Sequence, residues 1–286
     1  MGGKKLRAAL SGSGLITAPG VYDMISARIA DQLGFQALYM TGYGVSASLG
    51  LPDAGLVSYT EMVSRVAQIC QSTTTPVICD ADTGFGGLLN VERTVRGYEA
   101  AGAAAIQIED QVFPKRCGHT PGRRVVPAED MVRKIKVAAA SRASPDFLIV
   151  ARTDARTNHG LDEALRRGEA YAKAGADILF IESPESEEEM ARIGRHFNVP
   201  VMANMADGGR TPILSKPRLE ELGYRVAIFP ATGFLATAKA LSHVYGVLRQ
   251  TGSSDTLGAD LYSFDGFSRM VGFEHVWDFE KRWPET

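Results

Sequence analysis

The chain has 286 residues, of which 45% are hydrophobic and 22% charged, and its formal net charge is -2. This composition is typical of a globular protein with a large core, and the small net charge argues against binding to nucleic acid or to an anionic membrane surface. No apolar run is long enough to cross a bilayer, and the N-terminal segment lacks the apolar core of a signal peptide, so we expect a cytoplasmic protein.

Short apolar runs alternate with longer amphipathic stretches along most of the chain. Eight of these runs predict strands: they lie at 15–19, 37–42, 76–82, 104–110, 147–154, 177–183, 200–205 and 226–230. The stretches between them predict helices, and Ser58 and Glu61 form the capping-box pattern of a helix start. Because strands and helices alternate, we expect a parallel sheet, and eight such units predict an α/β fold of the (β/α)8 TIM-barrel type. A doubly wound open sheet is the alternative, although no GxGxxG motif follows the first strand.

No linker or low-complexity segment divides the sequence, so we expect one domain over residues 1–286, with the barrel at about 14–250. A further segment, about 253–286, follows the eighth predicted helix and is rich in aromatic and apolar residues. A free tail would not carry so many apolar side chains. We therefore expect a C-terminal helical extension that packs on the barrel or on another subunit.

Polar residues follow five successive predicted strands, at the end where a TIM barrel carries its chemistry. These strand ends carry Asp80 and Asp82, Glu109 and Asp110, Arg152 and Asp154, Glu182 and Ser183, and Asn204. A solvated cap is the alternative explanation for any one of them. Five in succession, all converging on one barrel mouth, instead predict a functional site.

Three carboxylates stand out within this set. Asp80 and Asp82 are two residues apart on a predicted strand, so their side chains point to the same face, and Glu109 ends the next strand. Without a cation these groups would repel one another and raise one another's pKa. A hard divalent cation removes that conflict, and oxygen ligands of this kind suit Mg²⁺ or Mn²⁺. The alternative is that the carboxylates pair with Arg152.

The stretch FPKRCGHTPGRRVV, residues 113–126, places Cys117 in a loop after the fourth predicted strand. Its neighbours Lys115, Arg116 and His119 would favour the thiolate and lower the pKa of the thiol. The loop is longer than a usual strand-to-helix connection, which is typical of a lid. The alternative is a solvated basic loop whose cysteine is incidental. The three cysteines of the chain have no paired spacing that would indicate disulfides or a zinc site.

Taken together, these motifs resemble the isocitrate lyase/phosphoenolpyruvate mutase superfamily, whose members are (β/α)8 barrels. The similarity covers about residues 14–250 and is greatest to the 2-methylisocitrate lyase, 2,3-dimethylmalate lyase and carboxyphosphonoenolpyruvate mutase-like branches. The stretches that carry it are YMTGYGVSASLGLPD (39–53), DADTGFGG (80–87), IED (108–110), PKRCGH (114–119), ARTDA (151–155) and ANM (203–205). KRCGH is specific, and its combination with DADxGFG at this spacing makes the resemblance strong.

The resemblance implies roles for individual residues. It implies a Mg²⁺ site in which some ligands act through water: Asp53, Asp80, Asp82 and Glu109. It implies catalytic residues, with a cysteine as the proton donor on a gating loop: Cys117, Tyr39, Arg152 and Glu182. It implies substrate contacts, of which the first two are backbone amides that bind the carboxylate of a 2-oxo acid: Gly42, Tyr43, Lys115, Arg116, Gly118, His119 and Asn204. Family members are typically tetramers that exchange C-terminal helices, so a homotetramer with exchanged helices is implied as well.

The implied activity is that of a Mg²⁺-dependent carbon–carbon lyase acting on a small carboxylate substrate. Such an enzyme would cleave a substituted 2-hydroxy dicarboxylate or tricarboxylate, of the 2,3-dimethylmalate or 2-methylisocitrate type, into a 2-oxo acid such as pyruvate and a second carboxylate. Phosphoenolpyruvate mutases carry asparagine on the gating loop, so Cys117 favours a lyase. Family members that cleave tricarboxylates carry an arginine after the eighth strand, where this chain has Leu235, so we expect a malate-type dicarboxylate. The alternatives are a carboxyphosphonoenolpyruvate or phosphoenolpyruvate mutase, an oxaloacetate hydrolase, and a non-catalytic barrel that binds metal and carboxylates.

Overall fold

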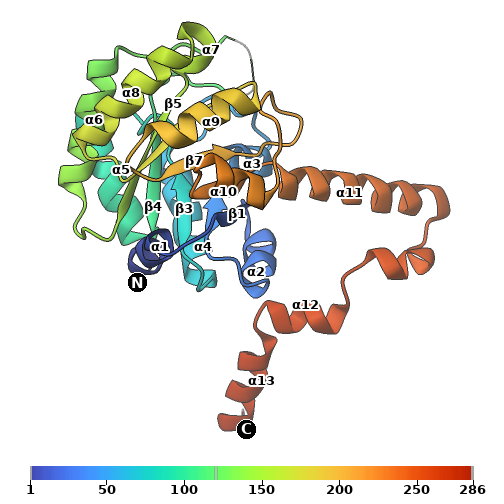
Figure 1. Ribbon diagram of the computed structural model, residues 1–286. Coiled ribbons are helices and arrows are strands. Elements are labelled where there is room, and N and C mark those ends of the chain that lie inside the picture. Colours follow the sequence, from blue (N-terminus) through green and yellow to red (C-terminus); the bar gives the residue numbers. More distant parts are fainter. Residues whose placement is uncertain (1, 119, 121, 285–286) are drawn as a thin grey trace. The chain divides into compact units, whose positions relative to one another are not determined.

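The computed structural model describes residues 2–118, 120 and 122–284, and its central feature is a closed barrel of eight parallel strands (Figure 1). The strands follow one another around the barrel in sequence order: β1 (Ile16–Val21), β2 (Leu38–Met40), β3 (Val77–Asp80), β4 (Ala105–Glu109), β5 (Leu148–Thr153), β6 (Ile178–Ile181), β7 (Val201–Asn204) and β8 (Val226–Phe229). β8 pairs with β1, with Ile16 opposite Val226, and this pairing closes the sheet. Each strand lies within two residues of its predicted ends, and the predicted (β/α)8 barrel is confirmed.

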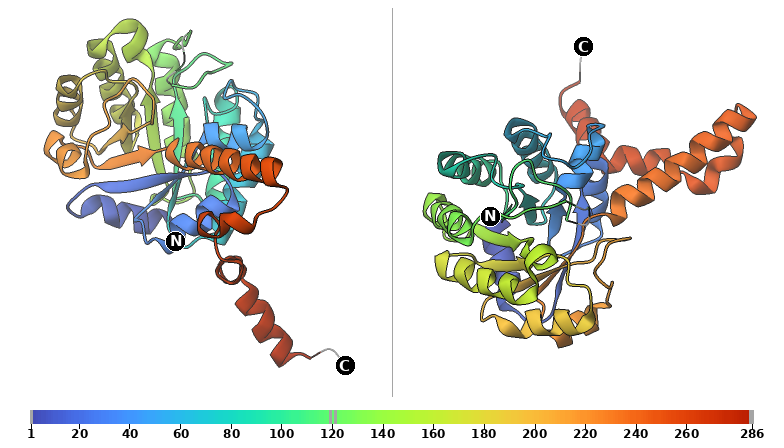
Figure 2. Two further views of the ribbon diagram at one scale, coloured as in Figure 1. Left: turned by 90° about the vertical axis from the view of Figure 1, so that its right-hand side faces the viewer. Right: turned by 90° about the horizontal axis from the view of Figure 1, so that it is seen from above.

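Helices form an outer ring around the strands of the barrel (Figure 2). The helices that connect successive strands are α2 (Met24–Gln32), α3 (Gly42–Ser48), α4 (Tyr59–Ser72), α5 (Leu88–Ala100), α6 (Ala128–Ser141), α7 (Ala155–His159), α8 (Leu161–Ala174), α9 (Glu187–His196) and α10 (Lys216–Leu222). At the start of α4, Ser58 Oγ accepts from the Glu61 amide at 3.4 Å and the Glu61 carboxylate accepts from the Ser58 amide at 2.7 Å. The predicted capping box is therefore confirmed. The short helices α3 and α7, which follow β2 and β5, were not predicted.

A further helix without a sequence prediction, α1 (Gly2–Ser11), precedes the barrel. Its Leu6 is fully buried in the hydrophobic cluster that fills the barrel, together with residues from the starts of the strands such as Ile16 and Leu148. Gly3 lies so close to the segment before β5 that a Cβ on it would overlap the backbone of Asp146. Helix α1 therefore closes the amino end of the barrel, and the carboxyl end is left for the polar residues.

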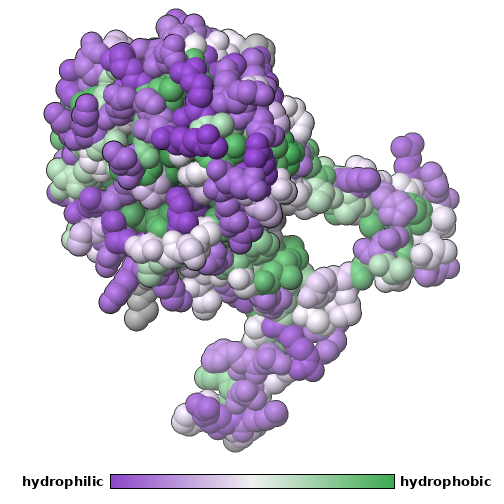
Figure 3. Space-filling model, viewed as in Figure 1, coloured by the Kyte–Doolittle hydropathy of each residue, from purple (hydrophilic) through white to green (hydrophobic). Residues whose placement is uncertain are grey.

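The chain divides into two compact units, Met1–Gly233 and Phe234–Thr286. The first contains the barrel, and the face of it shown in Figure 3 is mostly hydrophilic. The elements after β8 are α11 (Thr232–Thr251), a 3-10 helix (Asp255–Asp260), α12 (Phe264–Met270) and α13 (Phe273–Arg282). The second unit exposes many large apolar side chains, including Phe264, Trp277 and Trp283. A helical extension is thus present, and its exchange between subunits stays a prediction.

No helix of the described residues combines the length and the apolar character that crossing a membrane requires.

Candidate active site

A tightly turned loop follows β3 and carries two of the predicted metal ligands. β3 ends at Asp80, and Asp82 lies beyond it with a left-handed backbone (φ 48°). Strand alternation was expected to place this pair on one face, but the strand ends at Asp80. The position of Asp82 is fixed instead by its backbone amide, which donates to Asp80 Oδ1 at 3.1 Å. Phe85 is also left-handed (φ 57°). A non-glycine residue in this region costs about 1–3 kcal/mol, and such strain is typical of functional sites.

The backbone amide of Gly42, at the start of α3, points to the same carboxylate. It donates to Asp80 Oδ2 at 3.3 Å. A Cβ on Gly42 would come within 2.7 Å of that oxygen, so a larger residue would push the two segments apart. The side chain of the next residue, Tyr43, is exposed. That the amides of both residues bind a substrate carboxylate stays a prediction.

Lys115 lies among the carboxylates of the predicted metal site. Its Nζ contacts Asp53 and is 2.8 Å from Asp82 Oδ1, and its side chain is only 3% exposed. Lys115 was expected to contact substrate and to lower the pKa of the nearby cysteine thiol. In the structure, the Lys115 ammonium group instead pairs with two carboxylates, so any effect that it has on the pKa of the thiol is indirect.

Arg152, on β5, lies between two buried glutamates from the strands on either side. Glu109 is the last residue of β4, and Glu182 directly follows β6. Its Nη1 is 3.3 Å from Glu109 Oε2, and its Nη2 is 3.3 Å from Glu182 Oε2. Asn204 Nδ2 donates to Glu182 Oε2 at 3.1 Å. All four side chains are buried. The structure therefore brings these four predicted residues together, and the alternative in which a carboxylate pairs with Arg152 holds for Glu109.

Burial governs the charge states of this end of the barrel. Burial raises the pKa of Asp82 to about 6, with help from Asp80 and Asp53 and against the lowering effect of Lys115. Burial also raises the pKa of Glu109 well above its usual value, although Arg152 opposes the shift. For Lys115, burial lowers the pKa, but the surrounding carboxylates overcome this and raise it well above its usual value. Lys115 therefore stays charged, and Asp82 is poised to change charge near neutral pH.

The donor atoms at this end fit a hard divalent cation. Asp53, Asp80, Asp82 and Glu109 offer only oxygen. Glu109 Oε1 is buried and has no hydrogen-bond partner among the described residues, which leaves one donor atom unused. Over residues 2–118, 120 and 122–284, however, no three His, Cys, Asp or Glu side chains are gathered as a ready metal site. A cation that binds Asp82 would compete with Lys115 for its carboxylate.

Tyr39 joins this cluster through a residue that the sequence did not single out. The Tyr39 hydroxyl donates to Gln107 Oε1 at 3.0 Å, and Gln107 Nε2 donates to Asp80 Oδ1 at 3.4 Å. Burial raises the pKa of Tyr39 well above its usual value, so its phenol stays protonated at neutral pH. A buried polar side chain in the middle of the apolar run AIQIE was the available signal for Gln107.

The loop that carries Cys117 lies against Arg152 and Glu182. Gly118 packs so closely there that a Cβ on it would overlap Arg152 Nη2 and come within 2.9 Å of the Glu182 carboxylate. The Cys117 amide donates to the Asp53 carbonyl at 3.2 Å, and Cys117 is half-buried. These contacts bring the cysteine loop against Asp53, Arg152 and Glu182, and its action as a lid stays a prediction.

The side chain of Gln111 shapes the base of this loop. Its Nε2 donates to the Arg116 carbonyl at 2.8 Å, and its Oε1 accepts from the Arg116 amide at 3.1 Å. Gln111 also forms an antiparallel bridge with Val125, where the loop returns to the barrel. The Arg116 side chain is exposed. His119, a predicted substrate contact, lies outside the described residues.

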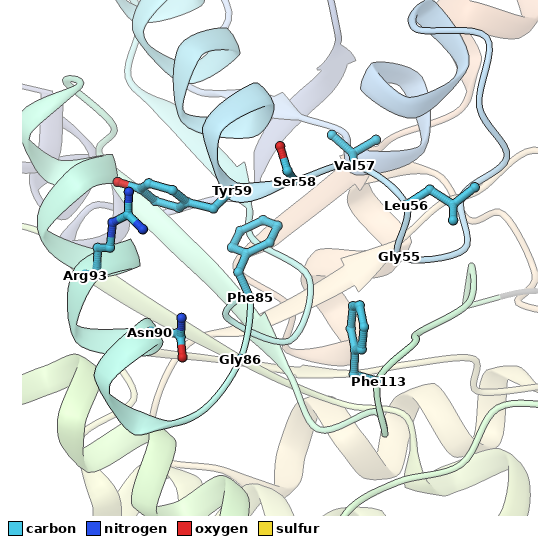
Figure 4. Close-up of a pocket in the computed structure, with 10 residues that line it drawn as sticks. All are labelled: Gly55, Leu56, Val57, Ser58, Tyr59, Phe85, Gly86, Asn90, Arg93 and Phe113. Atoms are coloured by element: carbon cyan, nitrogen blue, oxygen red, sulfur yellow. The ribbon is translucent and has the colours of Figure 1, made fainter.

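A separate cavity of about 440 Å³ lies beside the loop that follows β3 and the loop that carries Cys117 (Figure 4). Phe85 of the loop after β3 and Phe113 of the cysteine loop both face it, and Arg93 from α5 stacks on the ring of Tyr59 at 4.6 Å. Its lining is Gly55, Leu56, Val57, Ser58, Tyr59, Phe85, Gly86, Asn90, Arg93 and Phe113. Among the described residues, none of the predicted site residues lines it, so this cavity is distinct from the carboxylate cluster.

Comparison with known proteins identifies what this barrel is similar to. Residues 6–248 match the family model for phosphoenolpyruvate phosphomutase. The chain is 50% identical over 277 residues to a 2,3-dimethylmalate lyase of Eubacterium barkeri, covering 96% of each chain. It is 43% identical to a 2-methylisocitrate lyase of Aeropyrum pernix, covering 99% of this chain and 91% of the relative.

A solved structure supports the same relationship. An oxaloacetate acetylhydrolase in complex with the inhibitor 3,3-difluorooxalacetate superposes with a TM-score of 0.95 at 32% identity, covering 100% of this chain and 98% of that one. The chain therefore belongs to the phosphoenolpyruvate mutase/isocitrate lyase superfamily.

Proposed function

We propose that this protein is a metal-dependent carbon–carbon lyase that cleaves a substituted 2-hydroxy acid into a 2-oxo acid and a second carboxylate. One observation carries the proposal: the loop with Cys117 lies over Arg152 and Glu182, with Gly118 in contact with both. A cysteine in a loop beside a cationic group that can bind a carboxylate is suited to protonate a carbanion. The two lyase relatives support the same reaction class.

In the proposed reaction, Arg152 binds and orients a carboxylate of the substrate. The buried guanidinium is a preorganised donor, so it stabilises negative charge without reorganisation during the reaction. The substrate hydroxyl loses its proton to a basic group of the cluster, and the bond between the hydroxyl-bearing carbon and its neighbour breaks. The electron pair of that bond moves to the leaving carbon. Cys117 then gives its proton to this carbanion, acting as a general acid and not as a covalent nucleophile.

Members of this superfamily use a divalent metal ion, and we propose Mg²⁺, with Mn²⁺ as a substitute. Asp53, Asp80, Asp82 and Glu109 would hold it, some of them through water. When bound, the ion would act as a Lewis acid on the oxygen of the 2-oxo group. Gly42 and Tyr43 would bind the adjacent carboxylate through their amides, and Asn204 would help to orient the substrate.

For the substrate, we propose a malate-type dicarboxylate with alkyl substituents. By the resemblance, tricarboxylate lyases carry an arginine where this chain has Leu235, and a buried carboxylate without a cation is costly. The 50% identity to a 2,3-dimethylmalate lyase supports the same choice. Oxaloacetate hydrolysis is the second candidate, favoured by the close superposition with an oxaloacetate acetylhydrolase.

A substrate panel tests the proposal. Purified protein with Mg²⁺ is supplied with 2,3-dimethylmalate, 2-methylisocitrate or oxaloacetate, and pyruvate is followed by a coupled dehydrogenase. We expect the highest kcat/KM with 2,3-dimethylmalate. A large preference for the tricarboxylate would overturn the substrate proposal, and acetate and oxalate from oxaloacetate would favour the hydrolase. Release of no product from any of the three would favour a non-catalytic binding barrel.

For assembly, we propose a homotetramer in which α11, α12 and α13 are exchanged between subunits. The support is that α11 and α13 bury none of their residues within the chain. Exposed apolar surface of that extent is typical of an interface. Light scattering coupled to gel filtration measures the mass, and a monomer of 30.8 kDa would contradict the proposal. A cytoplasmic location remains an expectation.

A further inference from the structure

Asp154, which directly follows β5, binds two arginines at once. Arg152 donates to it twice, from Nε to Oδ2 and from Nη2 to Oδ1, each at 2.9 Å. Arg123 Nη1 donates to Oδ1 at 2.7 Å. The side chains of Asp154, Arg123 and Arg152 are 0%, 1% and 8% exposed. The carboxylate is therefore surrounded by two cations and screened from water.

Both ends of this arrangement are fixed by further contacts. The Asp154 amide donates to Asp110 Oδ1 at 2.9 Å, which holds its backbone. Arg123 Nη2 donates to Thr157 Oγ1 at 2.8 Å, and the Arg123 carbonyl accepts from Asn158 Nδ2 at 2.5 Å. Thr157 and Asn158 belong to α7. Arg123 thus fastens the far end of the cysteine loop to the segment that follows Arg152.

The contact with Asp154 is the best-defined one that Arg152 makes. Its contacts with Glu109 and Glu182 are single and longer, at 3.3 Å each. The contact with Asp154 is a fork of two parallel hydrogen bonds, which fixes both the position and the plane of a guanidinium. Glu109 and Glu182 alone would hold the guanidinium less tightly, because each makes a single and longer contact.

We propose that Asp154 is a positioning residue that aims Arg152 into the site, and that Arg123 ties the cysteine loop to the same carboxylate. The inference rests on the proposed function, in which Arg152 binds a substrate carboxylate. The loop with the proton donor and the arginine that orients the substrate would then share one buried anchor. A change at Asp154 would disturb both without touching the substrate.

Asparagine at this position separates positioning from bulk. It has nearly the same shape, but it offers one acceptor oxygen, and its amide hydrogens would face arginine donors. We expect Asp154→Asn to lower kcat/KM with 2,3-dimethylmalate about 100-fold, because a small misplacement of a binding group has an effect of that size. Arg152→Lys keeps the charge and loses the fork, and we expect it to lower kcat/KM by about 1000-fold.

A double-mutant cycle tests whether Asp154 acts through Arg152. If it does, the double variant D154N/R152K stays within about tenfold of the single variant R152K, since the fork is already lost and only the contact with Arg123 remains to be disturbed. Losses that multiply would overturn the proposal. A D154N variant whose kcat/KM matches the wild type would also overturn it.

Asp177 provides a matched control at the amino end of the barrel. It too accepts from two arginines, from Arg7 Nη2 at 3.0 Å and from Arg142 Nη1 at 2.6 Å. We expect Asp177→Asn to lower Tm by about 5 °C while kcat/KM changes less than about threefold. If D177N lowers kcat/KM as much as D154N does, the effect is one of general stability and the proposal fails.

Two further measurements keep the outcome clear. If D154N does not fold, Arg123→Lys replaces it in the same cycle, with an expected fall in kcat/KM of about tenfold that becomes smaller in the R152K background, because both arginines act through Asp154. Oxalate, a planar isostere of a 2-oxo acid enolate, is titrated with Mg²⁺ by calorimetry on each variant. Non-additive losses in oxalate affinity without turnover would reject the lyase and retain the positioning role. A wild type that neither turns over substrate nor binds oxalate would reject both.

Discussion

The two ends of the barrel both hold aspartates against cations, but they do so in different ways. At the amino end, the two carboxylate oxygens of Asp177 accept hydrogen bonds from Arg7 and Arg142. One of them also accepts from the Ile149 amide at 3.0 Å. At the carboxyl end, Asp82 and Ser183 have left-handed backbones, with φ of 48° and 59°. Asp177 thus has its partners on unstrained backbone, whereas the backbone at the carboxyl end is strained.

A buried carboxylate oxygen without a partner lies on the same side as the strain. Glu109 Oε1 is buried at the carboxyl end and, within the described part of the chain, lacks a hydrogen-bond partner. At the amino end, by contrast, Leu6 of α1 closes the barrel with apolar packing. Backbone strain and a buried oxygen without a partner both reduce the stability of the fold. They therefore persist only where other interactions or a function compensate for the loss. The amino end therefore maintains the fold, and the carboxyl end is prepared for a ligand, as in other TIM barrels.

The largest expected effect concerns the proton donor. We expect Cys117→Ser to slow lyase turnover by about 1000-fold, because a serine hydroxyl is a far weaker acid than a thiol. Oxalate affinity in the presence of Mg²⁺ should change less than about threefold, since the cysteine does not bind the 2-oxo acid in the proposed reaction. Steady-state kinetics and calorimetry measure the two quantities. Cys70→Ser on α4 is the matched control and should leave both unchanged; substantial activity in C117S would refute the acid role.

Two glycines, one at each end of the barrel, test whether the amino end serves stability and the carboxyl end serves function. A Cβ on Gly118 would overlap Arg152, and a Cβ on Gly3 would overlap the backbone of Asp146. We expect Gly118→Ala to lower kcat/KM about 100-fold with little change in Tm, because the loop must move off the arginine. We expect Gly3→Ala to lower Tm by about 5 °C and to leave kcat/KM within about threefold. Kinetics and thermal melts of both variants measure the two effects, and an exchange of the effects would contradict a structural amino end and a functional carboxyl end.

Metal binding should depend on pH at the carboxyl end. The pKa of Asp82 is about 6, because burial and the nearby Asp80 and Asp53 outweigh Lys115. Between about pH 4 and about pH 6 the folded protein therefore keeps a proton that the unfolded chain releases, so metal-free stability declines as the pH rises through this range. A metal ion needs the ionised carboxylate. We thus expect Mg²⁺ affinity to fall about tenfold from about pH 7 to about pH 5.

Calorimetric titration of Mg²⁺ at the two pH values measures this change. Lys115→Met provides the second arm, because it removes the cation that contacts Asp53 and Asp82. With the competing charge gone, Mg²⁺ should bind more tightly than to the wild type, and chelation of the metal should lower Tm more. An affinity that stays constant between the two pH values would contradict the role given to Asp82.

The sequence predicted the barrel because each strand is a short apolar run between polar turns. It also located the site, since a parallel barrel gathers the carboxyl ends of its strands. It could not assign partners, because pairs such as Lys115 with Asp53 and Arg123 with Asp154 are 62 and 31 residues apart. Nor did it predict α1, whose segment begins with glycines and lysines and offers no N-cap or long apolar run.

The smallest expected effect concerns Tyr39, which belongs to both regions. Its ring packs in the barrel core, and its hydroxyl donates to Gln107 beside Asp80. Tyr39→Phe leaves Gln107 Oε1 buried without that donor, so we expect a loss of about 1–2 kcal/mol in the free energy of unfolding. We expect turnover to slow less than about tenfold, because Gln107 keeps its contact with Asp80 at 3.4 Å. Urea denaturation and steady-state kinetics measure the two effects. If turnover instead slowed by about 100-fold or more at unchanged stability, the hydroxyl would take part in the chemistry, as the family resemblance implies, and the ligand-binding region would extend one layer deeper into the barrel.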